Sequence, residues 1–336
     1  MNGNTIGKVF KVTTFGESHG ESVGAIIEGC PAGIEISLKE IQTDLDRRKP
    51  GKNSMISSRK EPDKLEVVSG IKDGETTGGK IKLQVKNVDV RSNDYNEILY
   101  KPRPGHADLT NYLKYGKIPV GGGRASGRET VGRVLAGVIA KQILAKEGLE
   151  IKGKIIEIYR KKNGFEKTIL DAKAEQDSVG GIVEIVAKGV PPGLGEPVFD
   201  KLDADLAKAL MSIGAVKGVE IGAGIRSTRM KGSENNDPIM IIDDKLKTKT
   251  NNAGGILGGI SNGMPIVCRI AVKPTSSIEK EQDTVDVNNM KPAKLKIKGR
   301  HDPCICPRIV PVAEAMVAII LVDHLLRLEL YHKNEQ

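Results

Sequence analysis

Aromatic side chains are scarce in this chain of 336 residues, which has no Trp, four Phe and six Tyr. Proteins that hold single-stranded nucleic acid usually stack the bases on such rings. The few rings present are also not interleaved with the basic clusters. The composition therefore argues against a nucleic-acid partner and leaves open only a contact confined to phosphates.

Cysteine is scarce as well, with four residues and no C-x-x-C pair. A chain this long with so few cysteines is not a disulfide scaffold, and no second Cys/His cluster is present to complete a zinc site. Cys304 and Cys306 are separated by one residue, a spacing that places both thiols on the same face of a strand. We expect buried, inert thiols and no metal site.

The chain also lacks a leader-like segment, because Met1–Gly16 is polar and contains no apolar run typical of a secretory signal. The longest apolar run, Ile309–Val322, is interrupted by Pro311 and Glu314. It is too short to span a bilayer and predicts instead a buried helix over about 312–330. We expect no membrane association and a cytoplasmic location.

Positive charge, by contrast, is abundant: 52 Lys and Arg against 43 Asp and Glu give a formal net charge of +9. A basic surface attracts anionic partners. Since nucleic acid is disfavoured, the sequence favours an anionic small molecule.

Helices and strands are both predicted, which indicates an α+β fold. Ser37, Ser126 and Asp200 stand where helix N-caps are expected, and Ser37 and Ser126 are each followed by Glu three residues later. Segments rich in Ile and Val and bounded by Gly or Pro predict strands. These segments are residues 9–15, 23–29, 80–86, 181–190, 218–225, 265–274 and 294–299.

A faint internal repeat relates two turns, GCPAG (Gly29–Gly33) and GVPPG (Gly189–Gly193). Each turn follows a predicted strand and leads to a predicted helix. The pattern predicts two similar halves, about 1–160 and 178–330, joined through the polar segment 161–177 and packed with their histidine loops facing a common centre. Chance similarity of two G-x-P-x-G turns is the alternative.

Three of the five histidines share one context. His19 in GESHG, His106 in RPGHAD and His301 in GRHDP each lie within two residues of a glycine and of a carboxylate. A carboxylate can fix the tautomer of an imidazole and raise its pKa. The pattern indicates general acid–base chemistry near neutral pH. His324 and His332 lie on or beyond the last helix and are expected to be packing or surface residues.

Basic residues gather in similar loops. GGGRASGRE (Gly121–Glu129) leads into a helix N-terminus with two arginines, a combination that suits a bound anion. It is neither a Walker A loop nor a dinucleotide fingerprint. KPTSS (Lys273–Ser277) offers an ammonium and three hydroxyls for a second phosphate. RRKPGK (Arg47–Lys52) ends a helix, where the helix dipole alone also favours cations.

Eight motifs in this order resemble the chorismate synthase family: TTFGESHG, DLDRRKPG, RPGHAD, GGGRASGRET, PPGLGEPVFDKLDADLA, AGGILGGISNG, KPTSS and GRHDPC. The resemblance runs from Gly3 to about Leu328. It implies a single domain, 1–336, with a β-α-β sandwich of internal pseudo-two-fold symmetry, assembled as a homotetramer. It also implies a carbon–oxygen lyase that eliminates phosphate (anti-1,4) from 5-enolpyruvylshikimate 3-phosphate. The product is chorismate, at the last common step of the shikimate pathway to the aromatic amino acids, and reduced FMN is required without net redox change.

The resemblance also implies roles for individual residues. His19 would protonate the reduced flavin, His106 would help to protonate the departing phosphate, and Asp302 would act as the base through the flavin. The substrate would be clamped by Arg47, Arg48, Arg128 and Arg300. The flavin would be contacted by Arg124, Ala125, Ser126, Gly214, Ala215, Gly258, Lys273, Pro274, Thr275, Ser276, Ser277 and Arg300.

The chain departs from the family pattern at a few positions. Ala125 stands where relatives commonly have a serine, so one hydroxyl fewer is available and weaker flavin binding is expected. Ser54 stands where some relatives have an arginine, which leaves a contact to NADP in doubt, with Lys52 as a possible substitute. No segment resembles a flavin reductase, so reduced FMN is expected from an external enzyme. Two other interpretations stay open: a non-catalytic polyanion-binding protein, and a different flavin or phosphate enzyme on the same scaffold.

Overall fold

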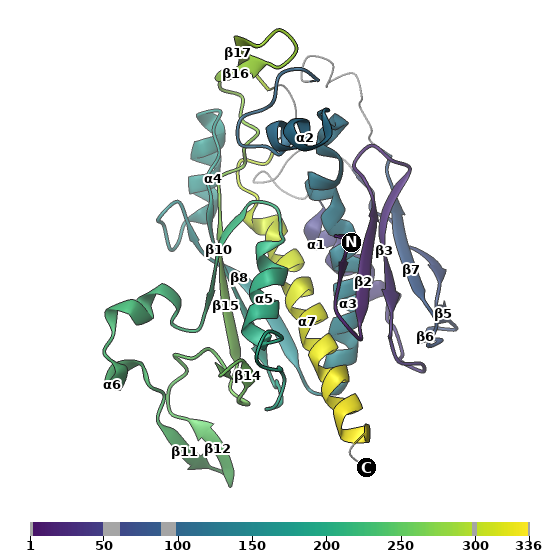
Figure 1. The fold of residues 1–336 in the computed structure, drawn as a ribbon, viewed down its shortest axis with the longest axis vertical. Coiled ribbons are helices and arrows are strands. Elements are labelled where there is room, and N and C mark those ends of the chain that lie inside the picture. Colours follow the sequence, from purple (N-terminus) through teal and green to yellow (C-terminus); the bar gives the residue numbers. More distant parts are fainter. Residues whose placement is uncertain (1–2, 50–60, 89–98, 298–300, 335–336) are drawn as a thin grey trace.

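The structure, a computed structural model, describes residues 3–49, 61–88, 99–297 and 301–334. It has mixed helices and strands, with two antiparallel sheets on either side of a layer of helices (Figure 1). The first sheet has the order β1-β2-β3-β7-β4 and consists of β1 (Thr5–Ile6), β2 (Lys11–Gly16), β3 (Ser22–Glu28), β4 (Glu66–Ser69) and β7 (Ile81–Lys86). The second has the order β10-β15-β9-β8 and consists of β8 (Glu150–Ile158), β9 (Gly181–Lys188), β10 (Val216–Ile221) and β15 (Ile266–Val272).

The helical layer contains α1 (Leu38–Arg48), α3 (Thr130–Lys146), α5 (Leu202–Met211) and α7 (Cys306–Asn334). α3 packs on the first sheet, α5 and α7 pack on the second, and α3 and α7 pack on each other along the centre. The inward faces of both sheets are aliphatic, as in β7, where Ile81, Leu83 and Val85 are fully buried and alternate with more exposed residues. This alternation is the pattern of a sheet with one buried face, which explains why these strands were predictable.

α7 is apolar on all sides because protein surrounds it. Residues Cys306–Lys333 are long and apolar enough to cross a membrane by length and composition, yet the most apolar stretch is wholly buried inside the protein. The prediction of a buried helix is therefore confirmed. The helix is longer than predicted, since it begins at Cys306 and includes Pro311.

Two of the three predicted caps needed correction. Ser37 caps α1 as expected, with its Oγ accepting from the Glu40 N–H at 3.3 Å. Ser126 accepts from the Arg128 N–H at 3.4 Å and so caps a short 3₁₀ helix, Gly127–Glu129, that precedes α3. Asp200 caps nothing, because Lys201 precedes α5 and the Asp200 carboxylate pairs with Lys8 instead.

Three segments also differ from the prediction. Residues 161–177, predicted to join the two halves, contain helix α4 (Phe165–Ala174), which buries Ile169 and Ala172. They connect β8 with β9 within the second sheet, so β8 belongs with the second half and not with residues 1–160 as predicted. β10 ends at Ile221, and a 3₁₀ helix, Gly224–Arg229, follows where a longer strand was predicted. The last predicted strand is displaced towards the N-terminus: β17 (Lys291–Leu295) pairs with β16 (Gln282–Asp286), and residues 298–299 of the prediction lie outside the described residues.

All four cysteines are buried free thiols, as predicted. Burial raises the pKa of Cys30 to about 11 and that of Cys268 to about 12, which keeps both thiols protonated and unreactive. Cys304 and Cys306 do not share a strand face, because Cys306 is the first residue of α7. The spacing argument was wrong at this point.

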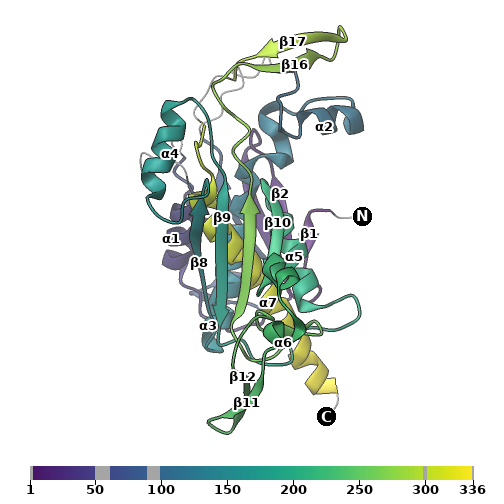
Figure 2. The same ribbon diagram turned by 90° about the vertical axis from the view of Figure 1, so that its left-hand side faces the viewer.

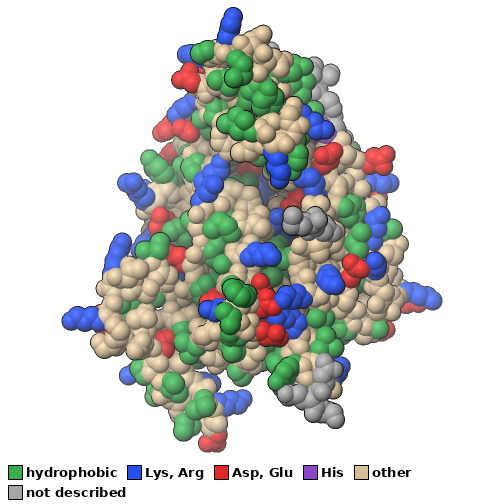
Figure 3. Space-filling model, viewed as in Figure 1, with side chains coloured by type: hydrophobic (Ala, Val, Ile, Leu, Met, Phe, Trp, Pro, Cys, Tyr) green, Lys and Arg blue, Asp and Glu red, His purple; other side chains and the backbone are tan. Residues whose placement is uncertain are grey.

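Two hairpins extend from opposite ends of the molecule (Figure 2). One is β16–β17. In the other, β11 (Ile239–Ile242) pairs with β12 (Lys245–Thr248), and the shared face of Ile239, Ile241 and Leu246 is about three-quarters exposed, at 73%, 74% and 74%. Hydrophobic side chains also gather over β16–β17 and α2 (Asp108–Tyr115) at the top of Figure 3. The remaining short elements are β5 (Ile71–Lys72), β6 (Glu75–Thr76), α6 (Gly232–Asn235), β13 (Ile256–Leu257) and β14 (Ile260–Ser261).

Candidate active site

The loop before α2 fixes the tautomer of His106. Its Nδ1 lies 3.1 Å from the Pro104 carbonyl oxygen, and its Nε2 lies 2.8 Å from Ser277 Oγ. A carbonyl oxygen can only accept, so Nδ1 carries the hydrogen and Nε2 of the neutral ring accepts from the Ser277 hydroxyl. The nitrogen that can take up a proton is therefore Nε2, on the side of the Lys273–Ser277 loop.

The carboxylate expected to serve His106 is committed elsewhere. Asp108 is buried and receives two hydrogen bonds from the Arg103 side chain, Nε to Oδ2 at 2.6 Å and Nη2 to Oδ1 at 2.9 Å, and a third from the Arg103 backbone N–H at 3.1 Å. Burial lowers the pKa of His106 to about 4, with Arg103 and Lys273 acting in the same direction and the Pro104 carbonyl and Asp108 opposing them. The expected rise in pKa was therefore wrong, because burial and nearby cations outweigh the carboxylate.

The Lys273–Ser277 loop follows β15 and contacts the His106 loop directly. Lys273 Nζ donates to the Gly105 carbonyl oxygen at 2.7 Å and to Ser276 Oγ at 2.6 Å. The Lys273 N–H donates to the Ala215 carbonyl oxygen at 2.9 Å. Two of the predicted flavin-binding segments, Gly214–Ala215 and Lys273–Ser277, thus meet the His106 loop at one end of β15. Among the described residues, no carboxylate forms an ion pair with the Lys273 ammonium there.

Polar atoms and open space in this region fit a flavin. Thr275 Oγ1 is buried and has no hydrogen-bond partner in the described part of the chain. A Cβ built on Gly214 would have no heavy atom of the protein within 4 Å. A buried hydroxyl without a partner is costly unless a ligand satisfies it. The donors present, hydroxyls and an ammonium, suit a phosphate or a ring carbonyl.

The glycines of the GGGR loop make room for His19. Gly121, Gly122 and Gly123 all have left-handed backbone conformations, with φ of 62°, 80° and 51°. A Cβ on Gly121 would lie 2.0 Å from His19 Cε1, so only glycine fits there. Ser18 Oγ donates to the Gly121 carbonyl oxygen at 3.1 Å and lies 3.0 Å from His19 Nδ1. This arrangement makes Nδ1 the donor to Ser18 and holds the ring against the loop.

Arg124 is turned towards β2. Its Nη1 donates to the Gly16 carbonyl oxygen at 2.6 Å, and its Nη2 donates to Thr14 Oγ1 at 2.7 Å. It also lines a cavity of about 270 Å³ beside α3 and α5, together with Arg133 and Lys208. Arg124 therefore holds the GGGR loop against β2. Its side chain also forms part of the cavity wall.

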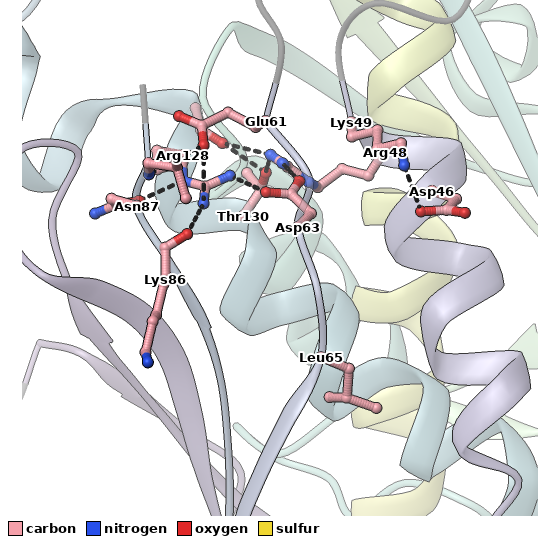
Figure 4. Close-up of polar contacts among 12 residues, drawn as sticks. Asp46, Arg48, Lys49, Glu61, Asp63, Leu65, Lys86, Asn87, Arg128 and Thr130 are labelled. Carbon is pink, nitrogen blue, oxygen red and sulfur yellow. Dashed lines mark hydrogen bonds and ion pairs between the residues drawn. The ribbon is translucent and has the colours of Figure 1, made fainter. Parts of the chain in front are cut away.

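Arg48 at the end of α1 and Arg128 before α3 meet on either side of Asp63 (Figure 4). Both arginines and the aspartate are buried. Arg308 Nε donates to the Arg48 carbonyl oxygen at 3.0 Å, and Arg308 also forms an ion pair with Asp302. A buried ion-pair cluster thus reaches the predicted base.

Further hydrogen bonds join this cluster to the histidine loops. Arg128 Nε donates to Asn87 Oδ1 at 2.7 Å, and Asn87 Nδ2 donates to the Gly20 carbonyl oxygen at 2.6 Å, next to His19. On the other side, the Val179 N–H donates to the Pro303 carbonyl oxygen at 2.9 Å. The neighbouring Ser178 Oγ donates to the Thr275 carbonyl oxygen at 2.6 Å. The loops of His19, His106 and Asp302 are therefore parts of one network.

Two predicted site residues lie elsewhere. Arg47 points away from Arg48 and donates to Glu314 at 2.8 and 2.9 Å and to Asp44 at 2.8 Å, so its guanidinium is held by carboxylates on α7 and α1. Gly258 lies in the turn between β13 and β14, where the neighbouring Gly259 packs against the side chain of Lys201 before α5. That is the opposite end of β15 from Lys273, about 20 Å away for a seven-residue strand.

Lys52, Ser54 and Arg300 lie outside the described residues. The sequence reasoning missed Asp63, Asn87 and Arg308. Each is a single polar residue in a loop or at a helix start, and each has at least one partner more than forty residues away in the sequence. The sequence indicated these residues only by placing polar and charged side chains near the motifs that resemble the family, as with Arg308 shortly after GRHDPC.

The comparisons with known proteins agree with one another. A family model described as chorismate synthase matches residues 10–326. A protein named chorismate synthase from Methanococcoides burtonii is 51% identical over 99% of both chains, and one from Methanothermobacter thermautotrophicus is 49% identical over 98% of this chain and 96% of its own. A solved structure titled as the crystal structure of chorismate synthase superimposes with a TM-score of 0.75. It is 30% identical, and the match covers 96% of this chain and 93% of the other.

Proposed function

The chain belongs to the chorismate synthase family, a family of lyases in aromatic amino acid biosynthesis, and from that premise we propose that it converts 5-enolpyruvylshikimate 3-phosphate into chorismate and phosphate. The reaction breaks the C–O bond to phosphate and removes a ring proton, and it leaves a new C=C bond. The observation that carries the proposal is the network in which the His106 loop contacts Lys273–Ser277 while buried arginines connect His19 with Asp302.

Reduced FMN is the proposed cofactor. When bound, it supplies electron density that eases departure of phosphate from a ring whose C–H bond is not acidic. Lys273, Ser276, Ser277 and the buried Thr275 hydroxyl would hold its polar groups, with the open backbone of Gly214 beside them. Ala125 and Ser126 belong to the proposed contacts as well. Arg124 supports their loop through its hydrogen bonds to Thr14 and Gly16 on β2.

Proton handling falls to three side chains. His106 is neutral in the described state, and an anion placed near Nε2 favours its protonated form. That change would make it a proton donor to the departing phosphate. Asp302 is oriented by Arg308 and offers a carboxylate oxygen as the proton acceptor. His19, held by Ser18 and the GGGR loop, is the second proposed acid.

The substrate carries two carboxylates and a phosphate, so the clamp is assigned to guanidinium groups. Arg48 and Arg128 are the proposed clamp residues, with Arg300 as a further member by resemblance. Arg47 is not retained, because Glu314 and Asp44 hold its guanidinium. The positive charge that binds the anionic groups is thus expected to come from buried arginines and not from a single exposed basic patch.

An anaerobic assay tests the proposed function. The protein is mixed with 5-enolpyruvylshikimate 3-phosphate and dithionite-reduced FMN, and chorismate absorbance and phosphate release are followed. Product is expected with reduced FMN and not with oxidised FMN. His19→Ala, His106→Ala and Asp302→Ala are expected to lower the rate. Flavin binding without chorismate formation would point to a different enzyme on the same scaffold.

An external source of reduced flavin is part of the proposal. NADPH added to the pure protein in air is expected to give no chorismate, and turnover under those conditions would contradict it. A functional contact to NADP is not proposed. The cytoplasm is retained as the expected location.

The internal repeat and the homotetramer are also proposed. The repeat is supported by the matching orders β2-β3-β7-β4 and β8-β9-β15-β10, each with a helix after its second strand. Self-association is supported by the exposed apolar side chains on one face of the β11–β12 hairpin, because contiguous exposed apolar side chains often mark an interaction surface. If Gly258 contacts flavin as the resemblance implies, a second copy must bring it, because it lies at the far end of β15.

A further inference from the structure

Asp63 lies between two buried arginines that the proposed function assigns to the substrate (Figure 4). Its Oδ2 lies 2.5 Å from Arg48 Nη2, and its Oδ1 forms an ion pair with Arg128 Nη1. Asp63 is 0% exposed and Arg48 is 1% exposed. One carboxylate thus bridges two guanidinium groups in the absence of solvent.

The chain fixes the position of Asp63 firmly. The side chain of Gln42 on α1 donates to the Asp63 carbonyl oxygen at 3.0 Å and accepts from the Leu65 N–H at 3.0 Å. Asp63 also has a left-handed backbone, with φ of 45°, a conformation that is uncommon for a residue other than glycine. Strain of this kind persists where the surroundings impose it and is concentrated at functional sites.

The electrostatics of the cluster require this carboxylate. Burial lowers the pKa of Arg48 to about 10, Arg308 and Arg128 act in the same direction, and Asp63 opposes them. Burial alone would raise the pKa of Asp63, but Arg48 and Arg128 outweigh it and keep the pKa below its usual value. Glu61 is a second buried carboxylate, 3.9 Å from Arg128 Nη2. Without Asp63, however, the two guanidinium groups would lose the carboxylate that they share, and an excess of buried positive charge would remain, which is strongly unfavourable.

The arginine pair nevertheless keeps hydrogen-bonding capacity for a ligand. Arg48 Nε is buried and has no hydrogen-bond partner within the described ranges. Among the described residues, Arg48 Nη1 makes two long contacts, 3.3 Å to the Gly127 carbonyl oxygen and 3.4 Å to Thr130 Oγ1. A buried donor of a charged group normally has a partner, so these atoms are suited to receive an anion.

We propose that Asp63 is a positioning residue for the substrate clamp: it is the fixed counter-ion that holds Arg48 and Arg128 side by side and limits how many negative charges the pair accepts. It acts through the arginines and does not itself touch the reacting atoms. This inference rests on the proposed function, because the substrate role of the two arginines does. It also has consequences for anion binding that do not depend on turnover.

The first test compares Asp63→Asn with Glu28→Gln. Both changes remove one negative charge, but Glu28 pairs with the exposed Lys80, away from the cluster. In the anaerobic assay, with rates corrected for the folded fraction from circular dichroism, Asp63→Asn is expected to lower kcat/KM by at least about tenfold. Glu28→Gln is expected to stay within about twofold of wild type. Asp63→Asn with wild-type or higher kcat/KM would overturn the proposal, since the carboxylate would then be dispensable or a competitor of the substrate.

Chemical rescue separates positioning from a general structural role. Asp63→Gly suits the left-handed backbone and leaves a space for a small carboxylate. Formate is expected to restore activity in a saturable manner, at least about tenfold over sodium chloride at equal ionic strength. Equal effects of formate and chloride would count against a specific carboxylate position.

Two further measurements keep the test decisive. If the neutral variants do not fold, Asp63→Glu keeps the charge while pushing the arginines apart, and its kcat/KM is expected to fall by about tenfold with a near-wild-type thermal midpoint. Wild-type activity of Asp63→Glu would contradict the proposal.

Inorganic phosphate is expected to raise the thermal midpoint of Asp63→Asn more than that of wild type, because it replaces the lost charge. The thermal-shift measurement can be made even if the wild-type protein forms no chorismate. That result would reject the proposed function but would leave the counter-ion role of Asp63 to be judged by the phosphate shifts. Equal shifts would reject the counter-ion role.

Discussion

The candidate site contains two cationic regions that differ in how their charge is compensated. In the cluster of Arg48, Arg128 and Asp63, every charge is buried and paired before any ligand binds. In the Lys273–Ser277 loop, the ammonium of Lys273 is partly exposed, and its hydrogen bonds within the described chain go to two neutral oxygens. The first region is therefore part of the fold's own stability, whereas the second has its charge available for a ligand.

The largest expected effect comes from breaking the buried cluster. Arg48→Leu leaves Asp63 buried beside a single arginine and removes a side chain that is 1% exposed. We expect a loss of about 3–5 kcal/mol in the free energy of unfolding, measured by urea denaturation. A loss below about 1 kcal/mol, as for an exposed ion pair, would show that the cluster is not a structural element.

The second effect uses pH to probe His106, which contacts the second region through Ser277. Its folded pKa of about 4 lies below the ordinary 6.5, so the fold favours the neutral ring. The stability present above pH 6.5 is lost as the pH falls towards 4, up to about 3 kcal/mol. His106→Gln is expected to lose less stability over this window in thermal unfolding. Identical pH dependence of the two proteins would contradict the lowered pKa, which an NMR titration of the ring can measure directly.

The third effect is on binding alone. Burial and Lys217 lower the pKa of Lys273, and in the part of the chain that the structure describes no carboxylate would lose its ion-pair partner if Lys273 were replaced. Lys273→Met is therefore expected to change the unfolding free energy by less than about 1 kcal/mol while weakening FMN binding by about tenfold or more. Flavin fluorescence titration measures the affinity, and Lys280→Met is the control with the same change in charge. A Lys273→Met variant that fails to fold would remove the distinction between the regions.

The smallest effect is expected at an ion pair that belongs to neither region. Lys280 and Asp177 form an exposed surface pair at 2.7 Å. Because water and salt screen such pairs, Lys280→Ala is expected to leave the thermal midpoint unchanged within error. A clear decrease would indicate that exposed pairs in this protein contribute more than assumed, and would weaken the comparison with the buried cluster.

The sequence predicted the elements that have a clear period or cap of their own. β3, β7, β9 and β15 alternate or run apolar, and α1 begins after Ser37. α4 was missed because its sequence is largely polar and buries only Ile169 and Ala172, too few for a helical pattern.

The candidate site was predictable at the level of loops and much less at the level of contacts. Arg47 and Arg48 are adjacent in the sequence, but successive residues of a helix point about 100° apart. Nothing local indicates which of them faces Asp63 and which faces Glu314. The partner of His106 proved to be Ser277, 171 residues away, rather than the nearby Asp108. Pairings of this kind depend on tertiary structure, which residue patterns do not encode.

α7 gives the fold a particular order of assembly. The helix that fills the centre, Cys306–Asn334, follows both sheets in the chain. During synthesis, α3 follows β2, β3 and β7 closely and can pack on the first sheet early. β8 and β9, by contrast, pack on α7, so their apolar faces lack this partner until α7 leaves the ribosome, and exposed faces of this kind are prone to aggregate. The core between the two sheets can therefore be completed only after nearly all of the described residues have been synthesised. The packing of α7 is the step that joins the two sheets into one domain.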